Sequence, residues 1–241
     1  MRFLLFTLYA PFGSFGEIAV GERRMGWDRP SRSAILGLVA AALGIERGDD
    51  DAHQALETGL YYAVRTDAAG RPFIDYHTAQ TPKARRARNF ATRREELAAD
   101  DLNTVLSSRE WRSDACYTGA LWSRPEGTVA LDAVSEALRQ PRFALCLGRK
   151  SAPLGLPLDP DIIEADTFMD AFAARQRNKE EETVLERIGI AERPEIAFDH
   201  DTPGAPAEAR IERRRDAVAS RTRWQFMDRA ERIVVTRGQR S

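Results

Sequence analysis

The sequence predicts an α+β fold in which a ferredoxin-like (RRM-like) palm carries an inserted basic thumb and a small C-terminal β-rich extension. Over residues 1–150, apolar runs and amphipathic segments alternate in the order strand, helix, strand, strand, helix, strand. This order is typical of an antiparallel sheet with two helices packed on one side. A charged stretch without apolar periodicity interrupts it at about residues 79–110. Residues 151–241 follow as the extension, with one helix and short strands.

The first element is a strand over residues 2–10, an apolar run rich in Phe, Leu and Tyr that suits burial on both faces. A loop with four glycines then leads through residues 11–30 to an almost wholly apolar helix, residues 34–45. Gly44 supplies the left-handed residue that ends this helix. Because apolar side chains surround the helix on all sides, we expect it to be buried against the sheet.

The N-terminus of that helix is the first candidate site. Ser31 or Ser33 can accept hydrogen bonds from its free amides, and Arg29 and Arg32 flank it. Free amides beside cations form a favourable place for an anion such as phosphate. Taken alone, the same residues favour an ordinary capped core helix.

The remaining elements of the palm follow in order. Residues 59–66 and 71–78 flank the turn-forming Asp67-Ala-Ala-Gly70, which predicts a hairpin. The palm is completed by a strand over 112–122, an amphipathic helix over 128–139 and a strand over 143–148.

Charge is segregated along the chain. The formal net charge is −1, so any affinity for nucleic acid must come from local patches. Residues 81–94 hold six basic and no acidic side chains, whereas residues 158–201 hold thirteen acidic and five basic ones. In the extension we predict a helix over 167–188 with a solvated charged face, and short strands near 210–218 and 231–237.

Cysteine usage and hydropathy indicate a cytoplasmic protein. Cys116 and Cys146 lie in apolar, strand-like runs and are expected to be buried thiols of a reducing compartment. The apolar N-terminus is too short for a signal peptide, and no apolar run approaches the length of a membrane span. The three His and two Cys are not spaced as a metal cluster, so we expect no metal and no other cofactor.

Several short stretches, taken in order, resemble one known family. They are Leu8-Tyr-Ala-Pro11, Pro30-Ser-Arg-Ser33, Leu36 to Ile45, Asp75-Tyr-His-Thr78, Arg109-Glu-Trp111, Asp114 to Thr118, Leu147 to Ser151, Pro153-Leu154, Pro157-Leu158, Arg215-Asp216 and Gln225-Phe226. Their order and spacing are similar to the CasD family of the type I-E CRISPR surveillance complex called Cascade. Residues 81–108 match this family only in position and basic character, and Arg112 stands where the family usually has Leu.

The resemblance implies an RNA-binding structural subunit that holds the five-prime handle of the guide RNA (crRNA) in antiviral defence. It implies a palm, and a thumb inserted between about His77 and Arg109. Its neighbours would be the repeated backbone subunit and the large subunit of Cascade, with target DNA met only through the complex and no membrane partner.

The cationic positions of the chain predict where RNA would bind. The candidates lie in the loop before the apolar helix, at the start of that helix, in the thumb and in the loop after residue 148. They are Arg23, Arg24, Arg29, Ser31, Arg32, Ser33, Lys83, Arg85, Arg86, Arg88, Arg93, Arg94, Arg109, Arg149 and Lys150. Each contact with a phosphate should be sensitive to salt, because binding releases counterions.

Two other functions stay open. A metal-independent endoribonuclease that processes CRISPR repeat RNA could use Tyr76, His77 and Lys83, although the alternating strand around His77 favours a packed, hydrogen-bonded histidine. A scaffold could instead dock its basic arm on an acidic protein surface without touching RNA. Trp111, Tyr117 and Trp122 are expected in the core, because they alternate with small residues in a strand.

Overall fold

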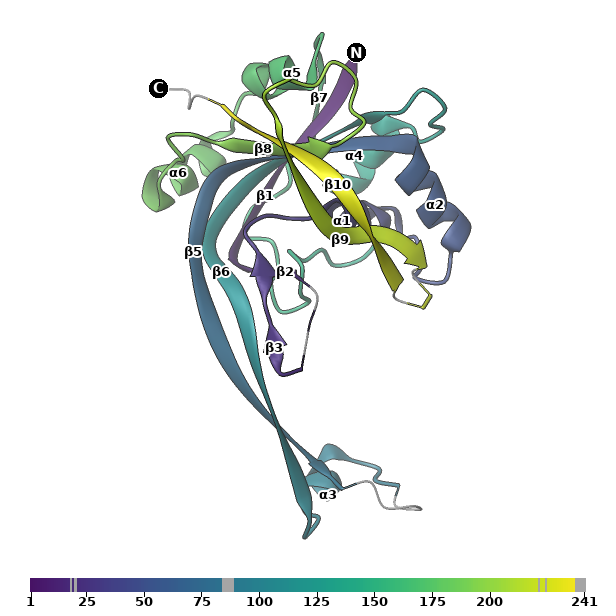
Figure 1. The fold of residues 1–241 in the computed structure, drawn as a ribbon, viewed down its shortest axis with the longest axis vertical. Coiled ribbons are helices and arrows are strands. Elements are labelled where there is room, and N and C mark those ends of the chain that lie inside the picture. Colours follow the sequence, from purple (N-terminus) through teal and green to yellow (C-terminus); the bar gives the residue numbers. More distant parts are fainter. Residues whose placement is uncertain (18, 20, 84–88, 221, 224, 237–241) are drawn as a thin grey trace.

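The computed structural model describes residues 1–17, 19, 21–83, 89–220, 222–223 and 225–236. A globular body carries one long projecting arm (Figure 1). The long strands are β1 (Arg2–Gly13), β5 (Leu60–Pro82), β6 (Leu102–Ser123), β7 (Asp161–Glu164), β8 (Glu195–Asp199), β9 (Arg210–Ser220) and β10 (Gln225–Val235). The short strands are β2 (Phe15–Gly16), β3 (Arg23–Arg24) and β4 (Gly26–Trp27). The helices are α1 (Arg32–Leu43), α2 (Asp50–Gly59), α3 (Arg93–Leu97), α4 (Leu131–Arg139), α5 (Phe168–Ala174) and α6 (Lys179–Ile188).

One antiparallel sheet, ordered β7-β1-β6-β5-β8-β10-β9, runs through the body. Short strand β3 joins the edge of β6 in parallel. The chain is therefore a mixture of helices and an antiparallel sheet, as predicted. The C-terminal part of the chain contributes β7 at one end of the sheet and β8, β9 and β10 at the other, so the extension is built into the same sheet as the palm strands.

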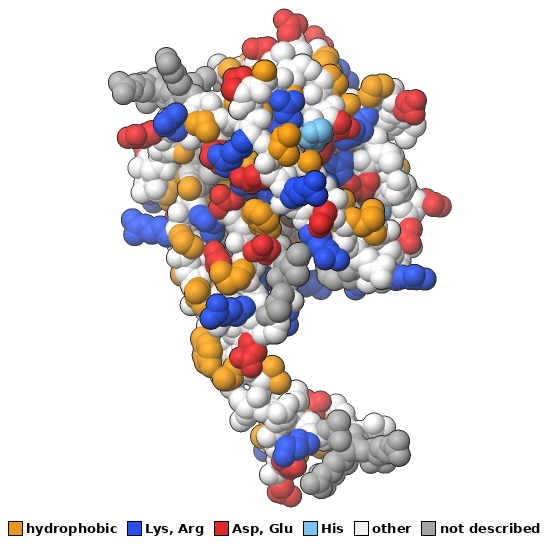
Figure 2. Space-filling view, viewed as in Figure 1, with side chains coloured by type: hydrophobic (Ala, Val, Ile, Leu, Met, Phe, Trp, Pro, Cys, Tyr) orange, Lys and Arg blue, Asp and Glu red, His pale blue; other side chains and the backbone are white. Residues whose placement is uncertain are grey.

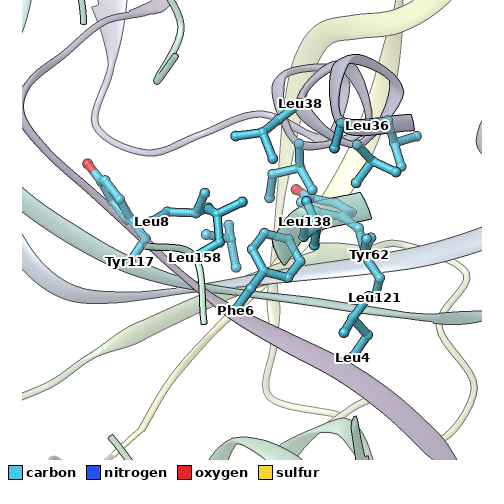
Figure 3. Packing of buried hydrophobic residues seen from close by; sticks show 14 of the residues in the cluster. Leu4, Phe6, Leu8, Leu36, Leu38, Tyr62, Tyr117, Leu121, Leu138 and Leu158 are labelled. Carbon is cyan, nitrogen blue, oxygen red and sulfur yellow. The ribbon is translucent and has the colours of Figure 1, made fainter. Parts of the chain in front are cut away.

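The core lies on both faces of the sheet, because successive residues of β1 point to opposite sides. Leu4, Phe6 and Leu8 pack on the face that α1 and α4 cover (Figure 3). Phe3 and Leu5 pack on the opposite face with α5. The prediction that residues 2–10 form a strand buried on both faces is confirmed. The buried apolar helix, now bounded as α1, is confirmed as well, and Gly44 ends it with a φ of 78°.

The predicted hairpin around residues 67–70 is wrong. Strand β5 continues through this segment and stays paired with β6 from Leu60 to Pro82. Asp67 is one extra residue, a bulge, whose buried carboxylate accepts hydrogen bonds from Arg65, Thr118 and Arg177. Gly70 takes a φ of 62°, and Asp114, in the facing position of β6, takes a φ of 55°. The two strands are therefore kinked at this pair of residues, and the chain does not reverse.

Beyond this kink, the rest of β5 and β6 leaves the body as a two-stranded arm, residues 71–113, with α3 near its tip (Figure 1). The predicted basic insertion at about 79–110 is thus the outer part of a hairpin whose strands begin in the palm. The apolar periodicity vanishes there because both faces of a free hairpin are exposed. Arg112 stands at the arm's base, where it donates a hydrogen bond of 2.6 Å to the carbonyl of Ala69.

Three further predictions fail in the second half of the chain. Residues 143–148 form no strand. The backbone amides of Arg142 and Phe143 donate hydrogen bonds to carbonyls at the end of α1. The free edge of β1 is paired with β7 instead. The helix predicted over 167–188 is two helices, α5 and α6, separated by residues 175–178. The extension therefore has two helices rather than one. Of the two free thiols, Cys116 is buried as expected, whereas Cys146 is only half-buried.

Helix α2 is not among the elements that the sequence predicted. The strands predicted at 210–218 and 231–237 extend to the hairpin β9–β10, which crosses over α1 (Figure 1). Within the described residues, no helix is long and apolar enough to cross a membrane.

Candidate nucleic-acid interface

The N-terminus of α1 is already occupied by a carboxylate of the protein itself. Ser31 caps the helix, accepting a hydrogen bond of 3.1 Å from the amide of Ala34, and its hydroxyl lies 2.9 Å from that of Ser33. The amide of Ser33 donates to Asp216 on β9 at 3.4 Å. The anion that the sequence predicted at this helix is therefore supplied from within the chain.

Arg29 and Arg32 are buried, so the expectation that they present free cations beside α1 is wrong. Arg29 is 2% exposed and donates to Glu212 at 2.7 Å and to Glu231 at 2.5 Å. Arg32 is 6% exposed and pairs with Glu57 and Asp199. The β9–β10 hairpin closes over the helix start and brings two of these carboxylates with it.

Glu231 is the centre of this buried network. Its carboxylate accepts hydrogen bonds from Arg29, from Arg229 at 3.0 Å and from the hydroxyl of Tyr62 at 2.6 Å, and Arg214 lies 3.5 Å away. Burial raises the pKa of Glu231, but the three surrounding guanidinium groups lower it by more, so the carboxyl stays ionised. The network joins the segment just before α1 to β5, β9 and β10 and is a structural element.

Replacing Ser31 by Ala therefore tests a cap and not a phosphate contact. We expect Ser31→Ala to lower the free energy of unfolding by about 1 kcal/mol, because the Ala34 amide loses its acceptor. RNA affinity should be unchanged. Urea denaturation measures the first quantity and a filter-binding titration the second. A tenfold loss of RNA affinity in a folded variant would return the start of α1 to the RNA interface.

A different group of cations comes together where the arm leaves the body. Arg24 on β3 lies beside Arg109 on β6, in the register of their parallel pairing. The guanidinium of Arg149 lies over Trp111, two residues from Arg109 on the same strand. Burial and the charge of Arg109 lower the pKa of Arg149, Asp75 raises it, and Arg24 lowers it further. We call Arg24, Arg109 and Arg149 the arm-root cations.

Local structure sets the position of Arg149. Gly148 has a φ of 91°, and a Cβ there would lie 1.8 Å from the carbonyl oxygen of Ser14. The loop can therefore lie directly against the end of β1 only with glycine at this position. Arg149 then reaches over the ring of Trp111, with its guanidinium carbon 4.8 Å from the ring centroid.

The arm-root cations have no ion pair of their own in the part of the chain that the structure describes. Nη1 of Arg149 is buried and has no hydrogen-bond partner there. Arg23 and Lys150 are exposed beside Arg24 and Arg149. Like charges held together in this way are stabilised by an external anion, and guanidinium groups match phosphate oxygens well.

Aromatic rings lie among these cations. Phe12 and Phe73 meet edge to face with centroids 5.5 Å apart, and Phe73 and Trp111 lie 6.5 Å apart with nearly parallel rings. Tyr117 and Trp122 are buried in the core as predicted, but Trp111 is not among the core clusters. This aromatic set was not predicted from the sequence. The available signal was that Phe73, Asp75 and His77 alternate along one strand and so share a face.

Among the described residues of the outer arm, two of the three predicted cations, Lys83 and Arg93, are paired with carboxylates. Lys83 pairs with Asp101 at 2.8 Å, and Arg93 pairs with Glu96 at 2.6 Å and donates to the carbonyl of Gln80. Arg94 is exposed. Arg85, Arg86 and Arg88 lie outside the described residues.

The three residues considered for RNA cleavage do not converge. Tyr76 and His77 are neighbours in strand β5 and therefore point to opposite faces, and Lys83 lies about 20 Å further along the chain. His77 makes the predicted hydrogen bond, to Asp75, but its side chain is 42% exposed rather than packed. Among the described residues, no group of His, Cys, Asp and Glu side chains is arranged to hold a metal ion.

Comparison with known proteins relates the chain to a family. A family model described as a CRISPR-associated protein (Cas_Cas5) matches residues 3–230. The chain is 31% identical over 164 residues to the CRISPR system Cascade subunit CasD of Escherichia coli (strain K12), a match that covers 65% of this chain and 69% of that protein.

Two solved structures share the fold. One, described as a CRISPR RNA-guided surveillance complex, matches with a TM-score of 0.65 at 23% identity, covering 98% of this chain and 90% of that one. The other, a crystal structure of a Cas protein, matches with a TM-score of 0.58 at 24% identity, covering 98% and 95%.

Proposed function

The chain belongs to the Cas5 family of CRISPR-associated proteins, and from this we propose that it is the CasD subunit of a type I-E Cascade and holds the five-prime handle of the guide RNA. One observation carries the proposal. The arm-root cations are gathered from three separate segments into one group without an ion pair among the described residues. Such a group favours the phosphates of a strand that passes between arm and body.

The proposed division of the chain follows from this role. The palm, residues 1–150, would carry the cations at its junction with the thumb, and the thumb would be the arm. Strands β7, β1, β6 and β5 follow the order that a ferredoxin-like palm requires, with β7 from the extension as the fourth strand. The extension, 151–241, would support the palm.

We also propose that the backbone and large subunits of Cascade are its protein neighbours, with target DNA reached only through the complex. The face of the arm turned away from the arm-root cations supports a protein contact. It exposes Ile74 and Tyr76, which are 65% and 63% exposed, with Glu110 directly opposite Ile74. Exposed apolar side chains of this kind are typical of protein contact surfaces.

Holding RNA is favoured over cutting it. A general base and a cation that stabilises the developing charge must act on the same phosphodiester. Tyr76, His77 and Lys83 lie on different faces and at different heights of the arm, so they cannot meet at one phosphate.

The handle itself is the sharpest probe of this function. Purified protein is titrated with a guide RNA and with the same RNA lacking its five-prime handle. We expect at least tenfold tighter binding of the RNA with the handle, and we expect both RNAs to be recovered intact. Equal affinities would refute handle recognition. A discrete cleavage product that disappears in His77→Ala would refute the non-catalytic role.

A further inference from the structure

Two large aromatic side chains, Phe12 and Phe73, are exposed at the base of the arm, and a third, Trp111, lies half-buried beside them. Phe12 is 51% and Phe73 38% exposed, and Trp111 lies next to Phe73. Burying such rings is worth far more than leaving them in water. Their exposure therefore indicates a ligand. Hydrophobic side chains gathered where the arm joins the body are visible in Figure 2.

These rings share a face with the arm-root cations. Phe73 lies directly opposite Trp111 in the strand pairing, and Asp75, two residues further along, lies opposite Arg109. Directly opposed residues, and residues two apart on one strand, point to the same side of a sheet. Arg149 lies on this same face, because its guanidinium covers the ring of Trp111.

A second observation indicates that a ligand that covers these rings also carries polar groups. The indole nitrogen of Trp111 and Nη1 of Arg149 are both buried and have no hydrogen-bond partner in the described part of the chain. A buried donor without an acceptor costs about 1–3 kcal/mol. Turning the Arg149 guanidinium from Trp111 toward the acceptor oxygens of a ligand would remove that cost.

We propose that Phe12 and Phe73, supported by the half-buried Trp111, form a stacking platform for unpaired RNA bases, next to the cations that hold the phosphates of the same strand. The inference rests on the proposed function and deepens it by naming the form of the RNA. The platform takes a single strand with its bases turned out, since a duplex keeps its base faces stacked on one another. Arg149, once its guanidinium turns away from Trp111, donates to the phosphate oxygens of that strand.

An apolar protein surface fits this place less well. A protein side chain such as Leu would cover the rings but leave the donors of Trp111 and Arg149 unpaired. It would also desolvate the arm-root cations without an anion. The opposite face of the arm, with Ile74 and Tyr76, lacks these cations and is the better protein surface.

The test compares RNAs that do and do not present bases. The probes are one single-stranded RNA, the same RNA annealed to its complement, and a strand of equal length with abasic positions. The variant is Phe12→Leu with Phe73→Leu, which keeps apolar bulk and removes the aromatic faces. The control is Ile74→Leu with Tyr76→Leu on the opposite face. Circular dichroism checks that each variant is folded.

The wild type should bind the single strand about tenfold more tightly than either the duplex or the abasic strand. The platform variant should lose that preference and retain its affinity for the abasic strand, while the control should behave as the wild type. A platform variant that keeps the preference, or a wild type that binds the intact and abasic strands equally, overturns base stacking and favours a protein contact. A wild type that binds none of the three RNAs contradicts the proposed function itself.

Discussion

Glu231→Gln is expected to destabilise the protein by about 3–5 kcal/mol, because it removes the one carboxylate that three buried guanidinium groups share. Glu231 is 0% exposed, so water cannot replace the lost charge. Arg29 would keep Asp28 and Glu212, and Arg229 would keep Asp216 and Asp199. Arg214 would keep no carboxylate among the described residues. A loss of this size is a large share of the stability of a typical domain.

Urea denaturation at neutral pH measures this effect. Glu195→Gln is the matched control, because Glu195 pairs with Arg210 on the surface at 2.9 Å, where an ion pair is worth about 0–1 kcal/mol. If Glu231→Gln and Glu195→Gln lowered the free energy of unfolding equally, the buried network would contribute nothing to stability. That result would contradict the structural role given to the network beside α1.

Lowering the pH should remove the stabilisation that ionised Glu231 provides. Burial raises the pKa of Glu231, and Arg214, Arg229 and Arg29 together hold it below its ordinary value. A group with a lowered pKa in the folded state stabilises the fold at any pH above its ordinary value of about 4.3, and this stabilisation is lost as the pH falls through the lowered pKa. The stability of Glu231→Gln should therefore fall less than that of the wild type below about pH 4.

The second large effect is on RNA binding. Arg109→Gln combined with Arg149→Gln is expected to weaken binding of a single-stranded guide RNA roughly 100-fold, since each charge-assisted contact with phosphate is worth about 1.5 kcal/mol. The dependence of log affinity on log salt should flatten by about 1.4, the change expected when two phosphate contacts are lost from a single strand. Titrations at several salt concentrations measure both quantities.

Arg187→Ala with Arg193→Ala is the control, because both arginines are exposed and lie in or just after α6, away from the arm root. The control pair should leave both the affinity and the salt dependence unchanged. An equal loss in the two double variants would mean that RNA binds by net charge alone, without a site at the arm root.

Local sequence patterns were sufficient to predict the elements that pack against the hydrophobic core. The strand at residues 2–10 and the apolar helix needed only hydrophobic periodicity. The continuity of β5 could not be predicted in the same way. Asp67 and Gly70 form a turn signal, and what cancels that signal is Arg177, which is 110 residues away in sequence and pairs with Asp67.

In the candidate site as well, some residues could be predicted from the sequence and others could not. Arg109, Arg149 and Arg24 were predicted as RNA contacts from charge alone, and the structure brings these three together. Arg29 and Arg32 carry the same charge and looked equivalent in the sequence. Their carboxylate partners include Glu231, which is 202 residues from Arg29, so only the fold distinguishes a buried pair from a free cation. Trp111 was assigned to the core because alternation cannot show where a strand leaves the body.

Photocrosslinking tests most directly whether the arm root, and not the start of α1, holds the RNA. A single-stranded guide RNA carrying 5-iodouridine is bound, irradiated and digested, and the modified peptides are identified by mass spectrometry. Crosslinks should fall on Phe12, Phe73 and Trp111, the aromatic residues beside the arm-root cations. Crosslinks confined to residues 29–33 and to β9 would contradict this account and place the RNA at the helix start.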